Sequence, residues 1–142
     1  MKKFPTIVKT LKSSKDLKLT LEIPEDLEWF SGHFDEVKVL PGMVPVLWAE
    51  EYLRIYYAPN ITIKSVDSVD FIHPITPKSA VELELRVDST GKIINFVYSD
   101  PTYPSPWVYN QGTLRLKFLG FSWIFNWRLF YLFNANQCPF SF

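Results

Sequence analysis

The sequence predicts an α+β fold that combines an antiparallel sheet with one long helix. Two observations predict it. A strand pattern precedes a helical pattern that begins near residue 43, and further strand patterns separated by turns fill residues 61–118. Several antiparallel strands after a single helix are typical of this class. The chain has 142 residues, 47% of them hydrophobic and 21% charged, so it can bury a core as one domain.

The first expected element is a half-buried strand within residues 6–23. Leu17, Leu19 and Leu21 alternate with polar residues there, which places the leucines on one face. Pro24 ends this strand. The following segment, 24–42, is irregular but rich in aromatic residues that need burial, so we expect an ordered loop and no flexible linker.

A helix is expected at about residues 43–57. The apolar residues that recur at helical spacing, and that predict one apolar stripe, are Val44, Leu47, Trp48, Tyr52 and Ile55. Pro45 lies in the expected first turn, where its missing N–H costs nothing. Pro59 closes the helix.

Strands separated by turns are expected over residues 61–118. The strand segments are ITIKSVDSVDFI, VELELRVDS, IINFVYS and WVYNQGTLRLKF, and the connecting turns and loops are HPITPKS, TGK and DPTYPSP. VELELRVDS alternates most regularly, with apolar side chains at every second position. His73, which precedes Pro74 in the first of these turns, is interpreted as a solvated turn residue.

Composition disfavours several classes of function. Fifteen basic residues balance fifteen acidic ones, so no basic excess points to nucleic acid. A single cysteine, Cys138, forms no internal disulfide and no cysteine-based zinc site, and two histidines are too few for a histidine-rich metal site. The first 19 residues carry charges throughout and predict neither a signal peptide nor a membrane span. We therefore expect a cytoplasmic protein.

The chain divides by composition into a domain of residues 1–118 and a tail of residues 119–142. The tail holds nine aromatic residues and one charge, Arg128, without a clear period. It is compatible with an interaction segment, with a core element, or with sequence not shaped by folding, such as a shifted reading frame. A membrane-surface helix would carry more basic residues, and the apolar run is shorter than a span. Membrane contact is expected only if the tail belongs to the working protein.

The segment from Trp29 to Glu51 carries the residues suited to catalysis. His33 lies in an aromatic loop, where burial lowers the pKa of an imidazole and lets it act as a base. Gly42 opens the helix and offers a backbone N–H at the positive end of the helix dipole. A base and such a donor together can remove an α-proton from a thioester and stabilise the enolate. An ordinary loop histidine and a common Pro-Gly turn would give the same pattern.

The motif resembles that of the 3-hydroxyacyl-acyl-carrier-protein dehydratases. The matching features are His33-Phe34, a six-residue spacer, Pro41-Gly42 and a hydrophobic helix. The approach DLEWFSGHF and the position of Trp48 resemble most closely the divergent branch of aryl-polyene-type dehydratases. The similarity covers about residues 17–118, and the later strand, Pro-containing turn and strand also resemble the family. It implies a hot-dog fold, in which an antiparallel sheet wraps one long central helix.

The resemblance implies a role for each matching residue. His33 takes the place of the catalytic base, and Gly42 that of the donor to the thioester carbonyl. The family places a carboxylic acid fourteen residues after the histidine, but this position is Leu47. Leucine cannot donate a proton, so activity is expected to be weakened unless Glu50 or Glu51 substitutes. Glu50 is also placed to pair with Arg54 four residues on.

The expected reaction is dehydration of a 3-hydroxyacyl-acyl-carrier-protein to the trans-2-enoyl thioester, in fatty-acid or polyene synthesis. We expect Phe34, Leu47 and Trp48 to line an acyl tunnel. The implied partners are an acyl-carrier protein with its phosphopantetheine arm and a second hot-dog subunit, in a homodimer or heterodimer. No cofactor, metal or nucleic acid is implied. The alternatives are a non-catalytic subunit that binds acyl-carrier protein or an active relative, and an acyl thioesterase on the same fold.

Overall fold

The computed structural model describes residues 2–31 and 38–118. Within them the elements are β1 (Thr6–Lys12), β2 (Asp16–Glu22), the short 3-10 helix η1 (Glu28–Phe30), α1 (Val44–Tyr56), β3 (Ile61–Phe71), β4 (Ala80–Val87), β5 (Ile93–Ser99) and β6 (Val108–Phe118). The expected helix and the expected strands after it are confirmed within a few residues.

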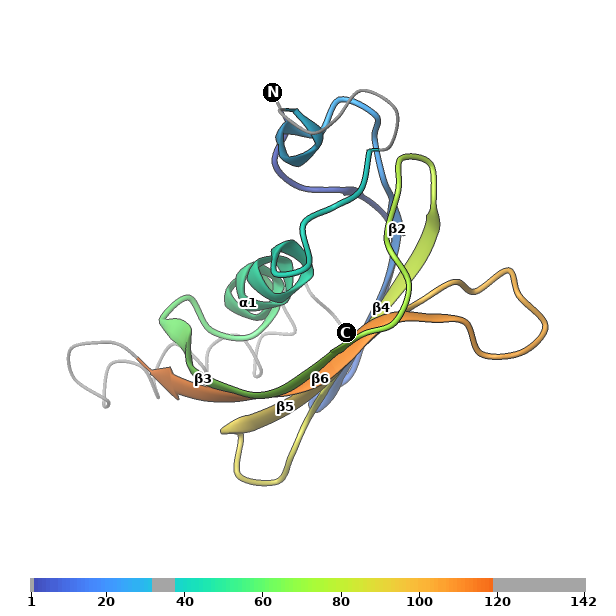
Figure 1. Cartoon of the computed structure of the whole chain (residues 1–142). Helices are drawn as coiled ribbons and strands as arrows, with labels where there is room; N and C mark the ends of the chain where they lie inside the picture. The colour runs from blue at the N-terminus through green and yellow to red at the C-terminus, as the bar shows by residue number, and fades with distance from the viewer. Residues whose placement is uncertain (1, 32–37, 119–142) are drawn as a thin grey trace.

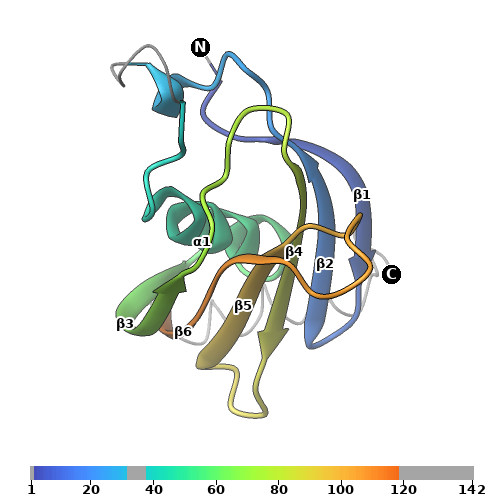
Figure 2. The same cartoon turned by 45° about the vertical axis from the view of Figure 1, so that its right-hand side comes forward.

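The six strands form one antiparallel sheet in the order β1-β2-β4-β5-β6-β3. The sheet curves, and α1 lies against its concave side (Figures 1 and 2). This is the α+β hot-dog arrangement that the resemblance implies. Strands β1 and β3 are the two edges of the sheet within the described residues.

Residues 6–23 form a hairpin of two strands, whereas the alternation had been interpreted as one. The Ser13 N–H donates to the Asp16 carbonyl at 2.7 Å and closes the turn between them. The prediction holds best for β2, where Leu17, Leu19 and Leu21 are buried. Strand β1 is almost entirely exposed, so its sequence lacks the strict alternation that burial imposes.

Helix α1 buries less of its apolar surface than the sequence predicts. Val44, Trp48 and Tyr52 are buried, but Leu47 and Ile55 are each 47% exposed, so the expectation that they join the buried stripe is wrong. The sheet covers only one side of α1, and these two residues lie on the other side. Met43, one turn before Leu47, is also exposed, so this flank of α1 presents apolar side chains to solvent.

Two tryptophans connect the start of the chain to the loop and to the helix. The indole N–H of Trp29 donates to the Lys3 carbonyl at 2.7 Å, and that of Trp48 donates to the same oxygen at 2.9 Å. Phe30 is buried, as expected for an ordered loop. The tail of residues 119–142 lies outside the described residues. In the part of the chain that the structure describes, no helix is long and apolar enough to cross a membrane.

Candidate active site at the start of the helix

A cleft of about 320 Å³ opens where α1 begins. One wall comes from the segment that leads into the helix, including Leu40, Gly42 and Pro45. The opposite wall comes from residues 71–75, at and after the end of β3, and Asn110 of β6 completes it. The Leu40 N–H donates to the Ile75 carbonyl at 2.9 Å, which holds the two walls together. Most of the lining is apolar, as in a site for an acyl chain.

Gly42 lies in this cleft with a free donor. Its N–H makes no hydrogen bond to any other described residue, and it precedes the first turn of α1. The unpaired N–H groups at a helix start attract a developing negative charge. A Cβ added at Gly42 would lie 2.9 Å from Cε1 of Phe71, so only glycine leaves the present space between them. The geometry therefore suits a donor that a ligand carbonyl can approach closely.

His73 lines the same cleft, although the sequence had been interpreted as placing it in a solvated turn. It is half-buried, and its ring stacks on Trp107 with centroids 3.8 Å apart. Its Nδ1 lies 3.0 Å from the Val108 carbonyl. A carbonyl can only accept, so Nδ1 carries the proton and donates. The ring is thereby fixed in one tautomer and one orientation at the end of β3.

Asn110 is a buried polar residue that the sequence analysis missed. It is 4% exposed, and its Oδ1 accepts no hydrogen bond from the described residues. It shares the helix-facing side of β6 with Leu114 and Leu116, which are buried. An asparagine at an inward position of an alternating strand, in WVYNQGTLRLKF, was the available signal. An unpaired polar oxygen here raises the question of what it binds.

Tyr98 of β5 holds the start of α1 against this part of the sheet. It pairs with Asn110 across β5 and β6, and its hydroxyl donates to the Pro45 carbonyl at 2.6 Å. Burial raises the pKa of the Tyr98 phenol well above its usual value, with the nearby Tyr52 adding to the rise. The hydroxyl therefore stays protonated and remains a donor. This bond holds the Gly42 end of α1 at a defined distance from Asn110.

Of the remaining predicted site residues, His33 and Phe34 lie outside the described residues, so the structure does not place them. Leu47 is exposed on the flank of α1 away from the sheet, and Trp48 is buried with its indole bonded to Lys3. Neither Leu47 nor Trp48 lines this cleft. An acyl tunnel lined by Phe34, Leu47 and Trp48 stays a prediction.

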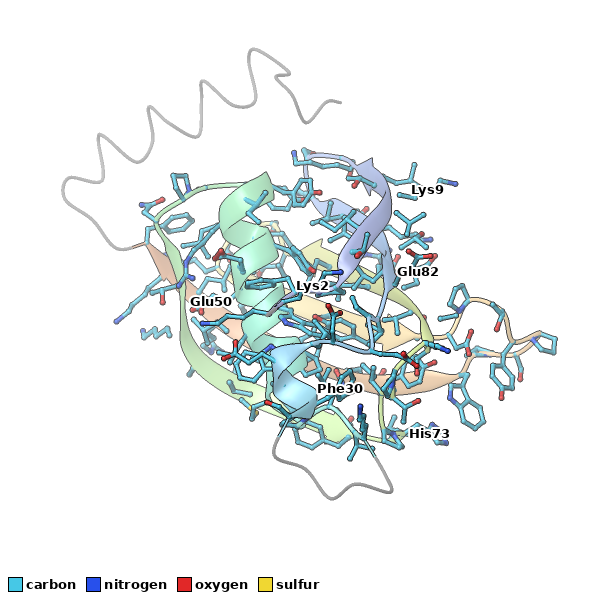
Figure 3. The ribbon with its side chains drawn as sticks, turned by 90° about the horizontal axis from the view of Figure 1, so that it is seen from above. Lys2, Lys9, Phe30, Glu50, His73 and Glu82 are labelled. Carbon is cyan, nitrogen blue, oxygen red and sulfur yellow. The ribbon has the colours of Figure 1, made fainter. Side chains whose placement is uncertain are left out.

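Glu50 and Glu51, the possible substitute acids, are held elsewhere. The Glu50 carboxylate accepts from the Ile63 N–H at 2.7 Å and from the Thr62 hydroxyl at 3.0 Å. It also pairs with Arg54 at 3.2 Å, which confirms the expected i,i+4 pair. Glu51 pairs with Arg54 at 3.3 Å. Figure 3 shows Glu50 beside the helix, far from His73, so the geometry assigns Glu50 to the anchoring of β3.

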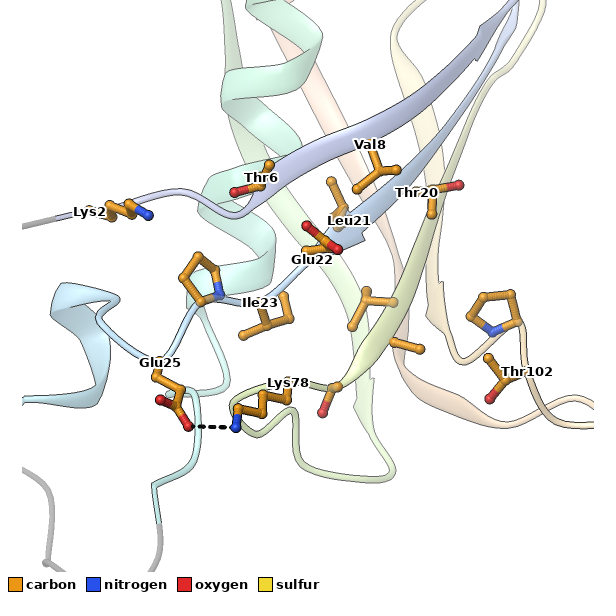
Figure 4. Close-up of a pocket in the computed structure, with 15 residues that line it drawn as sticks. Lys2, Thr6, Val8, Thr20, Leu21, Glu22, Ile23, Glu25, Lys78 and Thr102 are labelled. Atoms are coloured by element: carbon orange, nitrogen blue, oxygen red, sulfur yellow. Dashed lines mark ion pairs between the residues drawn. The ribbon is translucent and has the colours of Figure 1, made fainter.

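A larger groove of about 680 Å³ lies over β1, β2 and the turn before β4. Its lining includes Glu22, Lys2 and the exposed ion pair of Lys78 with Glu25 at 3.2 Å (Figure 4). Acidic and basic groups are balanced there, so the groove has no preference for a charged ligand. The described residues include no group of three or more His, Cys, Asp or Glu side chains that could hold a metal ion.

Comparison with known proteins agrees with this arrangement. Residues 9–105 match the family model described as ApeI-like, ApeI dehydratase. No curated protein matches the chain. A crystal structure of an uncharacterized protein from Erwinia carotovora subsp. atroseptica is 25% identical, with a TM-score of 0.71 over 82% of this chain and 98% of that one.

Two further solved structures share the fold. The dehydratase heterocomplex ApeI:P from Xenorhabdus doucetiae contains a chain that is 24% identical, with a TM-score of 0.71 over 80% of this chain and 97% of that one. An uncharacterized protein from Pyrococcus horikoshii is 14% identical, with a TM-score of 0.56 over 83% and 87% of the two chains. The family match covers well over half of the sequence, and the chain therefore belongs to the ApeI-like dehydratase family.

Proposed function

We propose that this protein removes water from a 3-hydroxyacyl thioester on acyl-carrier protein, giving the trans-2-enoyl product in fatty-acid or polyene synthesis. The observation that carries the proposal is the N–H of Gly42, which has no partner among the described residues and lies in an apolar cleft at the start of α1, in a chain of the ApeI-like dehydratase family. In this scheme the Gly42 N–H binds the thioester carbonyl. The negative charge that develops on that oxygen during proton removal is then stabilised.

His33 serves as the base in this proposal. It removes the proton from C2 of the acyl chain, and the electron pair forms the C2–C3 double bond as the 3-hydroxyl leaves. The leaving hydroxyl takes up a proton and departs as water. Position 47 supplies no such proton, because Leu47 has no ionisable group. Elimination by the chain alone is therefore slow, since acid–base assistance is typically worth about 10²–10⁴ in rate.

We further propose that a second hot-dog subunit supplies the missing carboxylate. The Xenorhabdus doucetiae structure is of a dehydratase heterocomplex, so assembly of two different subunits occurs among similar proteins. In this chain, Val66 and Phe71 of the edge strand β3 are exposed, as is Leu47 on α1. An eleven-residue edge strand with exposed apolar side chains is suited to pairing with another chain.

A non-catalytic subunit is the second candidate, and Leu47 is the observation that favours it. In that case the same cleft binds the acyl arm, and elimination takes place only in the partner. The thioesterase alternative loses support, because Glu50 is engaged with Ile63, Thr62 and Arg54 and is not free to activate water.

The test is a product assay. The purified full chain is supplied with 3-hydroxyacyl-acyl-carrier protein, alone and with a hot-dog subunit that carries the carboxylate, and products are followed by mass spectrometry. We expect enoyl product that disappears in His33→Ala. Enoyl product that forms only with the second subunit and survives His33→Ala in this chain would favour the non-catalytic subunit. Folded protein that yields none in either setting would contradict the dehydratase proposal. Free acid that survives His33→Ala but not Glu50→Gln or Glu51→Gln would establish a thioesterase.

A further inference from the structure

Asn110 presents an unsatisfied hydrogen-bond acceptor in an otherwise apolar cleft. The residue is 4% exposed, and its Oδ1 has no partner among the described residues. Leaving a buried polar oxygen unpaired is unfavourable, so such groups in folded proteins ordinarily have a partner. The cleft that Asn110 lines also holds the free N–H of Gly42. A ligand that fills the cleft can therefore satisfy both groups.

The fold keeps this acceptor available. Neighbouring polar groups that could pair with Asn110 are committed elsewhere. The Tyr98 hydroxyl, beside it on β5, donates to the Pro45 carbonyl. The imidazole of His73 donates through Nδ1 to the Val108 carbonyl and stacks on Trp107. The Ile72 and His73 N–H groups both donate to the Tyr109 carbonyl, at 2.8 and 3.0 Å.

We propose that Asn110 is a substrate-binding residue that accepts a hydrogen bond from the hydroxyl group of a hydroxyacyl chain. This inference rests on the proposed function. It assigns to the Asn110 side chain the distinction between a hydroxylated acyl chain and a saturated one. The Gly42 N–H is a donor and suits the thioester carbonyl. The Asn110 oxygen is an acceptor and suits the hydroxyl proton. A carboxamide does not supply a proton as an acid does, so Asn110 orients the hydroxyl and leaves proton donation to another group.

Discrimination of this kind has a physical basis. A saturated chain that enters the cleft leaves the Asn110 oxygen unpaired, whereas a hydroxylated chain offers it a hydrogen bond. A site built to pair with a hydroxyl rejects the analogue that lacks it for this reason. A neutral hydrogen bond of ordinary strength corresponds to a preference of about fivefold for the hydroxylated chain.

The experiment compares the binding of two ligands that differ only in the hydroxyl group. The full chain is titrated by calorimetry with 3-hydroxyhexanoyl-pantetheine amide and with hexanoyl-pantetheine amide. The amide replaces the thioester and makes the α-proton less acidic, so elimination does not consume the ligand during the titration. We expect the hydroxylated ligand to bind the wild-type chain about fivefold more tightly.

The variants assign the preference to one side chain. Asn110→Leu keeps the branched shape without the acceptor and should bind both ligands equally. Asn110→Ala provides a second truncation. Asn95→Leu is the matched control, because Asn95 is exposed and its Oδ1 accepts from Thr113 at 2.8 Å. It should keep the fivefold preference.

Three results would overturn the inference, and they separate it from the proposed function. Equal binding of both ligands to the wild-type chain would refute the role of Asn110 and leave the dehydratase proposal standing. A preference that survives both Asn110 substitutions would do the same. Binding of neither ligand would remove the acyl-pantetheine substrate class, and with it both proposals.

Discussion

Polar groups at the middle of α1 and at its N-terminal end differ in their partners. At the middle of the helix, the Glu50 carboxylate has three partners, which are Ile63, Thr62 and Arg54. At its N-terminal end, the Gly42 N–H and the Asn110 oxygen have no partner among the described residues. A satisfied polar group stabilises the fold, whereas unpaired groups that share a cleft are available to a ligand. We therefore interpret Glu50, one of the possible substitute acids, as structural, and place the candidate site at the N-terminal end of α1.

The largest expected effect is on stability, at Glu50. Glu50→Ala removes the acceptor for the Ile63 N–H and leaves Glu51 as the one carboxylate that pairs with Arg54 among the described residues. Urea unfolding should show a loss of about 2–3 kcal/mol, since hydrogen bonds to charged groups are worth about 1.5–3 kcal/mol. Dehydration per folded molecule should stay within about twofold of wild type, well below the effect of losing an acid–base group.

Glu51→Ala is the matched control, because the Glu51 side chain is more exposed and its carboxylate pairs with Arg54 alone among the described residues. It should cost less than about 1 kcal/mol. If Glu50→Ala abolished turnover without a loss of stability, Glu50 would be a catalytic acid and the contrast between the middle of α1 and its N-terminal end would fail.

The fold was far more predictable than the site. Alternation in VELELRVDS and helical spacing at Val44, Trp48 and Tyr52 report burial directly, so strands and helix could be placed from sequence. Leu47 and Ile55 share that helical spacing but face away from the sheet. Which side of a helix is buried depends on how many layers of structure pack against the helix. The periodicity of one chain's sequence does not show that number.

The candidate site was found only in part. Gly42 could be proposed from the sequence because its position before a helix has a chemical meaning. Asn110 was missed because its inward position in the alternating strand indicates burial but does not show that its oxygen lacks a hydrogen-bond partner. Its significance depends on pairing between β5 and β6 and on the neighbouring bond from Tyr98 to Pro45, both of which are long-range.

The second expected effect is on catalysis, at Gly42. Gly42→Ala places a methyl group against the Phe71 ring, which is 56% exposed and can rotate away. The melting temperature should therefore change little. The displaced ring should, however, narrow the space through which a thioester carbonyl reaches the Gly42 N–H. Steady-state kinetics should show a fall in kcat/KM of about tenfold, because small misplacements at a reacting group are costly. Unchanged kcat/KM would exclude Gly42 as the carbonyl donor.

The third effect is a gain in stability, at Asn110. Asn110→Leu replaces an unpaired buried amide with an apolar group of similar shape. Chemical denaturation should show that the free energy of unfolding rises by about 1 kcal/mol, because an unsatisfied buried polar group is removed. A loss of more than about 1 kcal/mol would mean that Asn110 has a structural partner, as Glu50 has at the middle of α1.

The smallest expected effect is on the free energy of unfolding, at Tyr109, which lies beside the cleft. Its hydroxyl donates to the Ala80 carbonyl at 3.0 Å and to Asp100 at 3.3 Å, next to the Val108 carbonyl that holds His73. Burial raises the pKa of the Tyr109 phenol to about 12, and the Asp100 carboxylate adds to the rise. The folded protein thus holds this proton more tightly than the unfolded chain. The contribution of the protonated Tyr109 hydroxyl to the free energy of unfolding is complete below a pH of about 10 and is lost as the pH rises toward 12.

Tyr109→Phe should reduce the free energy of unfolding at pH 8 by about 0.5–1 kcal/mol. The difference from wild type should then shrink between pH 10 and 12, the window set by the usual and the raised pKa. Other buried tyrosines also titrate at high pH, but they are common to both proteins and cancel in the difference. A gap that stays constant through this window would show that Tyr109 makes no hydrogen bond that depends on its proton.

The central claim is that this chain holds a dehydratase site that lacks only an acid, which position 47, on the exposed flank of α1, would supply to the cleft of a paired subunit. The most direct measurement is the rate of enoyl formation from 3-hydroxyacyl-acyl-carrier protein by Leu47→Asp, with Leu47→Asn as a control of the same shape that lacks a proton to donate. Leu47 is half exposed, so neither change should disturb the fold. The account predicts a rate for Leu47→Asp at least about tenfold above both the control and the wild type. Equal rates in all three proteins would contradict it.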